Sequence, residues 1–569
     1  MWAVEVTRAL PVNDMSEENL SDEPEKEPEE GKIEEPAKGG GWRARTASWR
    51  ARLSSVSVRD RNRIFLGLVL LAIAIYVAVF GTLSILRFTN YRASGLDIGI
   101  FDQTIWLMSK FKGSTSTIRG MNLFGDHMAP ILFFLVPLYW VKANVIGLLM
   151  VQTIALALGA LPIYLIARDR LGLRWPALGL ALAYLSYPAL QYMNLFDFHP
   201  ETLAVPLLLF AVLAVERKRF AWFYICCAGA AITKEDMALA VLVLALVVYF
   251  MYDKKTGRNV AIGAFVYFIA MVLLVIPRFG VEGFQYSGRL KLFGPTLKQA
   301  LYNIVRHPRN TFRVLVTKLN ITYTLQLLAP VAFLCLLAPV FLLPAIPAFL
   351  INIASDFAPQ HTISYHYTAA LVPFIFVAVI FGLVRIKKWA TGSMKLGKVL
   401  ATVAAIVLVM TLTFNYFLGP SPIAESFTAK KYSADKHIDI INEGLSKIPK
   451  DAPTSAQIYL LPHLSERKKI YMYPQPFVLL ADQSYFDKLD PEQRKYIWPN
   501  IYKVREKGKL HKDVPIPSVQ YVALDTGTDR WPLDFAEYDA IGRRLLENGR
   551  FTPIFEKDGV LILKRRGVP

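Results

Sequence analysis

The chain has 569 residues, of which 54% are hydrophobic and only 19% charged, so it is more apolar than a typical soluble protein. The apolar residues gather in runs of membrane-helix length between Ile64 and Leu418 instead of spreading evenly. This distribution excludes an ordinary soluble enzyme, a disordered protein and a repeat solenoid.

Cysteine content and charge exclude further classes. The three cysteines all lie inside apolar runs and form no C-x-x-C pair, which excludes a disulfide framework and a cysteine metal site. The net charge is +19, and residues 1–36 hold 12 acidic and 3 basic side chains, so the rest of the chain is net +28. Much of this charge lies in short loops beside apolar runs, where it orients a membrane protein, so we expect no nucleic-acid partner.

The N-terminal residues differ in composition from the rest of the chain. Residues 1–41 are rich in Glu, Pro and Lys, have few core-forming residues and predict a disordered acidic tail. This tail has no apolar h-region and is not expected to be a signal peptide. Residues 42–63 contain seven Arg and two Trp, which predicts a basic cytoplasmic segment beside the membrane.

Residues 64–418 predict an α-helical polytopic membrane domain with about eleven spans and with outer loops at 87–144 and 278–324. The predicted spans are Ile64–Leu86, Val145–Ala167, Pro176–Tyr192, Thr202–Val215, Phe220–Ile232, Met237–Tyr252, Val260–Ile276, Leu325–Leu343, Ala345–Ile353, Tyr367–Val384 and Val399–Leu418. We expect Pro130–Val141 to lie on the surface or to re-enter, because a further crossing would break the parity of the loops.

Orientation follows from four basic clusters, which are expected to face the cytoplasm. The clusters are Arg168–Arg174, Glu216–Arg219, Asp253–Arg258 and Arg385–Lys398. The N-terminus is then cytoplasmic, and the residues after the last span lie outside. The basic outer loop 278–324 is expected to carry amphipathic helices on the membrane surface.

Residues 419–569 are no longer membrane-like and predict a small extracytoplasmic α/β domain. Short apolar runs predict strands at Gln457–Leu461, Lys469–Met472, Val519–Leu524 and Val560–Lys564. Helical patterns cover Ala434–Ser446 and Phe535–Asn548.

Acidic and histidine residues gather in five segments, all on the predicted outer side. The segments are Leu96–Gln103, Gly125–His127, Asp197–Glu201, Thr233–Asp236 and Gln360–His366. Polar residues in or beside membrane spans are costly, so this one-sided gathering predicts an extracytoplasmic site near the membrane boundary.

Asp97 lies just before a predicted helix over Ile98–Lys110, where it could act as the N-cap. Asp102 lies about one turn further on and could share its face. A carboxylate at such a helix start is well placed to act as a general base. A simple helix cap at Asp97 and a solvated Asp102 remain the alternatives.

Two of the segments combine carboxylates with histidines. Asp126 and His127 could bind a metal or a phosphate, although a turn with a capping Asp would use the same residues. Asp197 and His199 end one helix and Glu201 opens the next, which is also ordinary chemistry for a helix start.

Charge also interrupts the apolar run from Ala221 to Phe250. Lys234, Glu235 and Asp236 are adjacent there and indicate either a functional rim or a turn between two spans. His361 and His366 do not have the spacing of a zinc-binding helix, so they predict either contact with a phosphate or sugar, or a solvated loop.

The stretches LDIGIFDQ, GDHMAPILFFLVPLY, DFHPETLAVPLL and TKEDMALAVL together resemble a prokaryotic membrane-protein family known as domain of unknown function 2079. The resemblance runs from about residue 90 to the end and includes IYLLPHLSERKKIYMYP and GVLILKRR. That family is grouped with the GT-C superfamily of integral membrane glycosyltransferases. The resemblance and the lack of organelle signals together favour a prokaryotic plasma (inner) membrane.

The resemblance implies inverting transfer of a sugar from a polyprenyl-phosphate donor to an extracytoplasmic glycan, lipid or protein acceptor. An acid in the first outer loop would be the general base, here Asp97 or otherwise Asp102, although the chain lacks the adjacent Asp-Glu pair of some GT-C families. A divalent cation, Mg or Mn, sometimes helps to hold the lipid phosphate, and the C-terminal domain often helps to bind the acceptor.

The resemblance and the residues themselves together lead us to expect three groups of site residues. The phosphate or metal shell would consist of Asp126, His127, His199, Glu201, Lys234, Glu235 and Asp236. Substrate contacts would come from Gln103, His361 and His366. Lys234 and outward arginines such as Arg87, Arg92, Arg289 or Arg306 could stabilise the leaving phosphate.

Two competing functions remain open. A transporter or flippase of a lipid-linked or polar substrate predicts ionisable residues at mid-membrane depth and pseudo-symmetric halves, and neither is evident in the sequence. A non-enzymatic scaffold that displays the C-terminal domain predicts that Asp97, Glu201 and Glu235 can each be replaced without functional loss.

Overall fold

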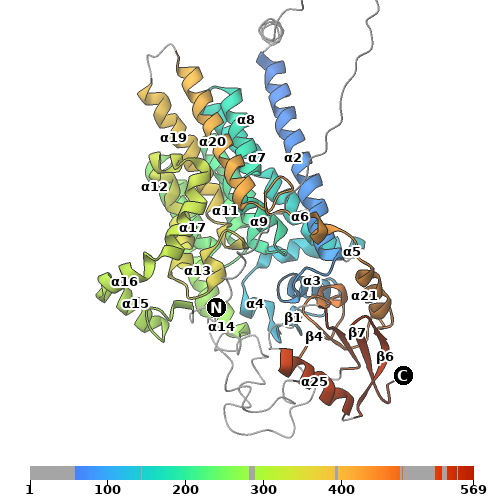
Figure 1. Ribbon diagram of the computed structural model, residues 1–569. Coiled ribbons are helices and arrows are strands. Elements are labelled where there is room, and N and C mark those ends of the chain that lie inside the picture. Colours follow the sequence, from blue (N-terminus) through green and yellow to red (C-terminus); the bar gives the residue numbers. More distant parts are fainter. Residues whose placement is uncertain are drawn as a thin grey trace, which may run out of the picture. The chain divides into compact units, whose positions relative to one another are not determined.

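The computed structural model describes residues 58–142, 144–280, 289–390, 395–474, 477, 519–527, 535–547 and 549–568. The predicted acidic tail and most of the basic segment 42–63 lie outside these residues. Asn62–Pro569 form one compact unit, which is mostly helical and carries a five-stranded sheet in its C-terminal part (Figure 1).

Among the described residues, four helices are long and apolar enough to cross a membrane by length and composition. They are Arg59–Thr89 in α2 (Val58–Thr89), Val145–Leu171 formed by α6 (Val145–Leu158) and α7 (Ala160–Leu171), Lys254–Phe279 formed by α13 (Lys254–Ala270), a π turn and α14 (Ile276–Phe279), and α20 (Leu396–Leu418). A fifth results if α16 (Pro308–Leu315) and the segment Lys318–Val331, bent by 59°, count as one span. The expected eleven spans are therefore not confirmed as continuous helices.

The other apolar segments are shorter or broken. Their helices are α8 (Arg174–Leu185), α9 (Pro188–Leu195), α10 (Ala204–Glu216), α11 (Phe220–Ala231), α12 (Met237–Met251), α18 (Ile346–Ala354) and α19 (Val372–Trp389). The predicted span Leu325–Leu343 is wrong as a single helix. Its first part, α17 (Lys318–Leu328), ends because Pro330 has no N–H to continue it, and Ala332 and Phe333 then adopt left-handed backbone at φ 52° and 57°.

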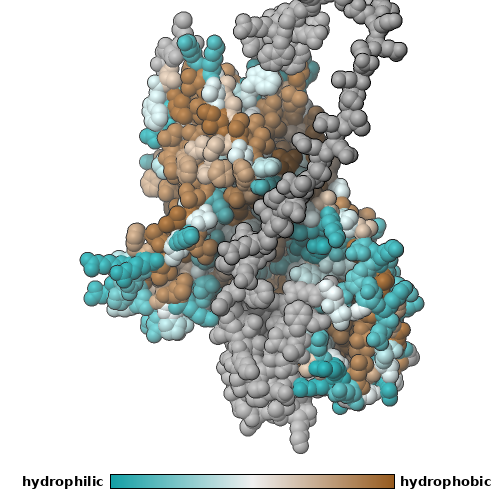
Figure 2. Space-filling model, in the orientation of Figure 1, coloured by the Kyte–Doolittle hydropathy of each residue, from teal (hydrophilic) through white to brown (hydrophobic). Residues whose placement is uncertain are grey.

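The helical part has a buried centre and an apolar outer surface. Helices α10 and α19 are buried along most of their length, which explains why both are apolar all round. Helix α2 instead leaves Leu71 and Ile75 more than half exposed. Figure 2 shows apolar residues gathered in a broad hydrophobic band over the helical part, as expected for a surface that faces lipid.

The C-terminal sheet is mixed, with strand order β4-β3-β5-β7-β6. Its strands are β3 (Thr454–Ala456), β4 (Ile470–Met472), β5 (Tyr521–Asp525), β6 (Phe551–Lys557) and β7 (Val560–Arg565), accompanied by α21 (Lys436–Ser446) and α25 (Phe535–Glu547). Strand β3 is parallel to β4 and β5, whereas β7 is antiparallel to β5 and β6. This sheet with its helices fits the expected small α/β domain.

One predicted strand is displaced. Gln457–Leu461 is not a strand, because β3 ends at Ala456 and the chain then turns. The backbone oxygen of Ile458 accepts a hydrogen bond from Gly95 N at 2.9 Å, so this turn belongs to the packing against the first outer loop. Strand β6, with Pro553 inside it and polar residues along it, was not predicted.

The sheet shares its hydrophobic core with the outer loop 87–144. That loop contains α3 (Ile100–Ser109), the short pair β1 (Thr115–Ser116) and β2 (Met121–Asn122), α4 (Leu123–Asp126), a 3-10 turn (Pro130–Leu135) and α5 (Val136–Lys142). Buried side chains of α3, such as Ile105, belong to one cluster with Leu461 and Met472. The C-terminal residues therefore help to fix the position of the first outer loop.

Candidate functional site

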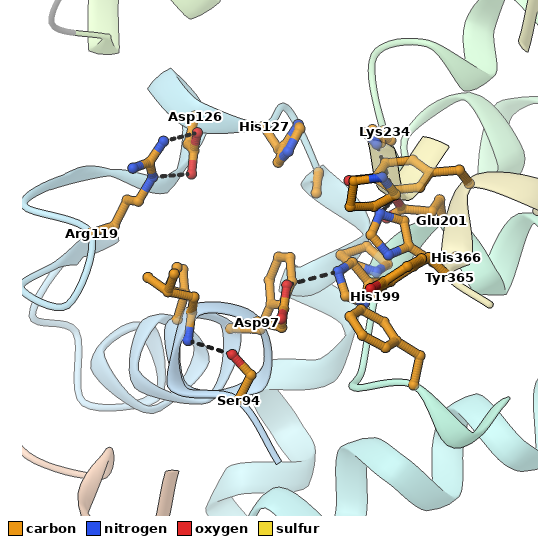
Figure 3. Close-up of a pocket in the computed structure, with 18 of the residues that line it drawn as sticks. Ser94, Asp97, Arg119, Asp126, His127, His199, Glu201, Lys234, Tyr365 and His366 are labelled. Atoms are coloured by element: carbon orange, nitrogen blue, oxygen red, sulfur yellow. Dashed lines mark hydrogen bonds and ion pairs between the residues drawn. The ribbon is translucent and has the colours of Figure 1, made fainter. Parts of the chain in front are cut away.

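A cavity of about 480 Å³ lies between the outer loop 87–144, the connections between helices at residues 196–201, 233–234 and 357–367, and Ile458 of the C-terminal part. Its volume falls within the range typical of small-molecule sites. Seven predicted site residues line it, namely Asp97, Asp126, His127, His199, Glu201, Lys234 and His366 (Figure 3). Segments far apart in the sequence thus converge on one polar cavity.

Asp97 does not cap a helix, which was the alternative to its expected place in the site. A π turn (Gly95–Gly99) precedes α3, and Ser94 is its cap, accepting a hydrogen bond from Leu96 N at 3.2 Å. Because Ser94 caps the turn, the carboxylate of Asp97 can face the cavity, where its side chain is 28% exposed. Its Oδ1 lies 3.4 Å from Nε2 of His199.

The imidazole of His199 is oriented by its other nitrogen. Nδ1 donates to the backbone oxygen of Asp197 at 2.8 Å, which directs Nε2 towards Asp97. Burial alone would lower the pKa of His199, but the hydrogen bond and charge of Asp97, with the charge of Glu201, outweigh it and raise the pKa. The contact with Asp97 therefore favours the imidazolium form of His199.

Asp197 belongs to the support of this pair and not to the cavity lining. Its carboxylate accepts a hydrogen bond from Arg87 at 2.5 Å and another from Ser94 N at 2.7 Å. These contacts tie the end of α2 and the cap of the π turn to the residue whose carbonyl orients His199. Arg87 thus helps to position the site through Asp197, and it does not line the large cavity itself.

A second charged pair lies next to His199. Glu201 Oε1 accepts a hydrogen bond from Lys234 Nζ at 2.9 Å and lies 3.3 Å from Nε2 of His366. Burial alone would raise the pKa of Glu201, but Lys234 outweighs it and lowers that pKa. Burial opposes the charge of Lys234 too, yet Asp236 and Glu201 raise its pKa. This pair is therefore ionised.

His366 differs from His199 in charge. Its ring stacks on that of His199 with centroids 3.5 Å apart and planes 17° apart. Burial and the neighbouring His199 hold the pKa of His366 well below its usual range, so this imidazole is neutral. Its Nδ1 is buried without a hydrogen-bond partner among the described residues.

The facing wall of the cavity carries further charge. Arg119 binds Asp126 through two hydrogen bonds of 2.8 and 3.2 Å, as Figure 3 shows. Nδ1 of His127 lies 3.2 Å from Oε1 of Glu235. Arg289 also lines the cavity, with its guanidinium 4.5 Å from the centre of the Phe357 ring. Basic groups from two segments, the outer loop 87–144 and the segment that begins at Arg289, therefore face the same space.

A smaller cavity of about 160 Å³ adjoins the first and shares Glu201, Lys234 and His366 with it. Glu235 and Asp236 line this second cavity but not the first. Asp236 Oδ1 has no hydrogen-bond partner among the described residues, and Asn352 and Gln360 add two amides to the wall. The smaller cavity is thus rich in groups that bind hydroxyls.

Three predicted site residues line neither cavity. Asp102 is fully buried and accepts hydrogen bonds from Tyr139 and Ser465, each at 2.5 Å. Gln103 holds the β1–β2 pair by accepting from Ser116 at 2.8 Å and from Thr117 N at 3.0 Å.

His361 is similarly engaged in local structure. Its Nδ1 lies 2.5 Å from Asn320 Oδ1, and its Nε2 lies 2.8 Å from the backbone oxygen of Ser355. These contacts connect α17 with the segment that follows α18. The structure therefore places Asp102, Gln103 and His361 in the packing around the site.

The residues around the cavities do not fit a bound Mg or Mn ion. Such ions favour several oxygen ligands in one small cage. No three His, Cys, Asp or Glu side chains of the described residues are close enough together to hold a metal. The carboxylates of Asp126 and Glu201 instead bind Arg119 and Lys234.

Several lining residues escaped the sequence prediction. They include Ser94, Arg119, Phe196, Thr233, Phe357 and Tyr365. Arg119 lies seven residues before its partner Asp126 in the same polar loop, a weak signal that the sequence did offer. The aromatic residues stand beside the predicted acids and histidines and carry no chemical signature of their own.

Comparison with known proteins gives one family and several distant structures. The family model described as predicted membrane protein (DUF2079) matches residues 87–562. No curated protein matches the sequence. Crystal structures of ArnT from Cupriavidus metallidurans are similar at 12–13% identity, with TM-scores of 0.46 bound to undecaprenyl phosphate and 0.45 in the apo state.

These ArnT matches cover 89% and 88% of this chain and 98% of ArnT. The apo oligosaccharyltransferase of Archaeoglobus fulgidus gives a TM-score of 0.40 at 14% identity, covering 80% of this chain and 69% of that chain. Likenesses this low carry no argument about fold or function. The assignment to a family therefore rests on the sequence model alone.

Proposed function

The chain belongs to the DUF2079 family of predicted membrane proteins, and from this premise we propose that it is a membrane glycosyltransferase. It would transfer a sugar from a polyprenyl-phosphate donor to an extracytoplasmic glycan, lipid or protein acceptor. The observation that carries the proposal is the carboxylate of Asp97, which faces a cavity whose other walls present Lys234 and Arg289. A base and phosphate-binding cations across one space suit phosphoryl-linked group transfer.

The donor phosphate is assigned to the basic side of the large cavity. Lys234 is ionised and Arg289 is always charged, so both can compensate a phosphate anion. The outer helices expose apolar side chains, as a surface in contact with lipid does. The isoprenoid tail of the donor could therefore stay in the membrane beside these helices. The bound undecaprenyl phosphate of the ArnT crystal is a ligand of the same kind, but the proposal does not depend on it.

The transferred sugar is assigned to the smaller cavity. Its volume of about 160 Å³, against about 480 Å³ for the large cavity, suits a small polar group better than a long chain. Its carboxylates and amides, among them Asp236 and Asn352, can bind sugar hydroxyls, whereas carboxylates repel a phosphate. Sugar and phosphate would then occupy neighbouring cavities that share Lys234.

The reaction is a single displacement at the anomeric carbon. The acceptor oxygen forms a bond to that carbon while the bond from carbon to phosphate oxygen breaks, and the phosphate leaves with the electron pair. Asp97 takes the proton of the acceptor hydroxyl. His199, with Nε2 3.4 Å from Oδ1 of Asp97, orients the carboxylate, and Lys234 and Arg289 stabilise the departing phosphate. A single displacement inverts the anomeric configuration.

The proposed topology follows the basic loops. The N-terminus is cytoplasmic in the plasma membrane, and the cavities and the C-terminal sheet lie outside. The C-terminal part would help to bind the acceptor, because Ile458 lines the large cavity.

The test is incorporation of labelled sugar from a panel of polyprenyl-phosphate sugars into membrane acceptors. Asp97→Asn should abolish transfer at unchanged expression. Asp439→Asn, at an exposed position of α21 away from the cavities, is the matched control and should retain it. Full activity of Asp97→Asn would refute the assigned base. Flux of a lipid-linked substrate across vesicles, with no transfer, would favour a transporter instead.

A further inference from the structure

Helices α15 (Leu297–Arg306) and α16 (Pro308–Leu315) form a hairpin that is both basic and apolar on its surface. His307 alone joins them, and the two helices pack on each other. Figure 1 shows this hairpin, residues 297–315, projecting from the side of the helix bundle. Its position leaves most of its surface uncovered.

The apolar stripe of the hairpin is strongly exposed. On α15, Leu301 and Val305 lie one turn apart and are 54% and 82% exposed. Phe312 on α16 is 65% exposed. Helices with so marked a separation of apolar and charged faces normally bury the apolar face against something. No described residue of the chain covers it.

The charge of the hairpin is uncompensated. Lys298, Arg306, Arg309 and Arg313 are exposed, and none of them forms an ion pair with another described residue. The sequence contains no Asp or Glu between Arg289 and Ser355. The hairpin therefore offers four cations and no anion, which complements a negatively charged surface.

The path of the chain places the hairpin at the edge of the apolar band. Helix α16 is followed after a bend of 59° by the apolar segment Lys318–Val331. A short amphipathic helix that meets an apolar segment at such an angle is typical of a helix lying in the membrane interface. A second copy of this chain is a poor occupant, because it would bring two identical basic faces together.

We propose that residues 297–315 lie on the lipid leaflet at the side of the cavities and bind anionic phospholipids there. Leu301, Val305 and Phe312 enter the boundary between headgroups and acyl chains. The four basic side chains contact the phosphates of anionic headgroups. This inference does not depend on the proposed reaction.

The hairpin also contacts the segment that forms part of the cavity wall. Asn303 Nδ2 donates to the backbone oxygen of Phe293 at 2.7 Å, and Phe293 is buried. The same short segment begins with Arg289, which lines both cavities. Lipid contact at α15 therefore steadies the segment that holds Arg289.

The test uses the full chain in vesicles of phosphatidylcholine alone and of phosphatidylcholine mixed with phosphatidylglycerol. An environment-sensitive dye is attached at Val305→Cys, and the native Cys226, Cys227 and Cys335 are buried. We expect a blue-shifted emission and quenching by lipids that carry a quencher near the headgroup, both stronger with phosphatidylglycerol. High salt should weaken the difference between the two vesicles, because exposed charges are screened.

A charge variant and its matched control separate binding from folding. Changing Lys298, Arg306, Arg309 and Arg313 to Gln should remove most of the difference between the two kinds of vesicle. Each of these charges should favour the membrane-bound position of the hairpin by about fivefold when phosphatidylglycerol is present. Changing Lys430, Lys431, Lys447 and Lys450 to Gln removes the same charge from another exposed region and should leave the effect intact.

Three results would overturn the proposal. The dye could remain in water in both vesicles, or respond equally in both and be unaffected by the charge variant. The dye could also be shielded already in detergent together with a doubled mass, which would identify a second copy as the occupant. If the two charge variants have equal thermal unfolding midpoints, a difference in their lipid response does not come from a folding defect.

Discussion

The rings of His199 and His366 stack with their centroids 3.5 Å apart, yet their surroundings shift the two pKa values in opposite directions. The carboxylate of Asp97 lies beside Nε2 of His199, and the backbone oxygen of Asp197 lies beside Nδ1, so both favour the imidazolium of His199. Burial and the neighbouring charge of His199 lower the pKa of His366 and keep it neutral. One imidazolium beside one neutral imidazole avoids repulsion between two cations. The two imidazoles also face different carboxylates: Nε2 of His199 lies 3.4 Å from Asp97, and Nε2 of His366 lies 3.3 Å from Glu201.

Replacing His199 should weaken the proposed transfer and alter its pH dependence. His199→Gln removes the charge that supports Asp97, and we expect the rate to fall by about tenfold to hundredfold. Because the folded-state pKa of His199 is raised, its imidazolium is present below that pKa and is lost as the pH rises through it. Wild-type activity should therefore decline on the alkaline side at this step, and His199→Gln should lack the step.

Rates of sugar transfer measured across the pH range check this expectation. His437→Gln, at a histidine of α21 that lies away from both cavities, is the control and should keep the wild-type profile. An unchanged profile in His199→Gln would remove His199 from the support of Asp97.

The buried pair of Glu201 and Lys234 should behave as a unit in stability. Their side chains are only 5% and 10% exposed. Lys234→Met leaves a carboxylate buried without its cation and should cost about 3–5 kcal/mol in the free energy of unfolding. Adding Glu201→Gln removes that unpaired charge and should restore most of the loss. Transfer should stay low in both variants, because the phosphate loses Lys234.

Unfolding of the detergent-solubilised chain, followed together with the transfer assay, measures both effects. Equal instability of the single and the double variant would show that the two residues do not compensate each other.

Much of the fold could be predicted from the sequence, because apolar runs, basic loops and alternating strands are local patterns. The π turn at Gly95–Gly99 could not, since Ser94 rather than Asp97 caps it, and that choice depends on Asp197 from a distant segment. The number of continuous helices was also overestimated. Prolines and left-handed residues such as Ala332 break helices inside runs that remain uniformly apolar.

The candidate site was predicted mainly through its charges. Residues such as Glu201 and Lys234 stand out because acids and bases are rare near membrane spans. Asp102 had the same signature but lies in the packing, because its partners Tyr139 and Ser465 come from other segments. Sequence spacing along α3 alone could not distinguish a buried carboxyl from one that faces a cavity.

Asp102 should affect stability in a pH-dependent way. Burial, together with the charge of Glu466, raises the pKa of Asp102 to about 7, from the 3.8 of a free side chain. The folded state therefore favours the protonated form, and this contribution, on the order of 4 kcal/mol, is present below about pH 4 and lost as the pH rises to about 7. Asp102→Asn is always neutral and should flatten this part of the stability profile.

Thermal unfolding midpoints of the wild type and Asp102→Asn at acidic and neutral pH test this. Asp439→Asn serves again as control, since its side chain is exposed. If the difference in unfolding midpoint between the wild type and Asp102→Asn is the same at both pH values, the buried carboxyl does not have the raised pKa that we expect.

Gly95 should be required for the position of Asp97. A Cβ at Gly95 would lie 2.8 Å from the backbone oxygen of Ile458, closer than Cβ atoms approach in real structures, and 3.0 Å from the Leu461 side chain, which is a tight contact. Gly95→Ala must therefore push the π turn away from the C-terminal part, at a cost of about 1–3 kcal/mol, and must move Asp97 with it. We expect a loss of transfer larger than the loss of stability explains.

The matched control is Gly67→Ala in α2, where a Cβ would meet nothing within 4 Å. Alanine is favoured over glycine inside a helix, so this variant should be as stable as the wild type or more stable by up to about 1 kcal/mol, with full activity. Comparing transfer rates at temperatures well below both unfolding midpoints separates geometry from stability. Normal transfer in Gly95→Ala would show that contact between the first outer loop and Ile458 does not set the position of the base.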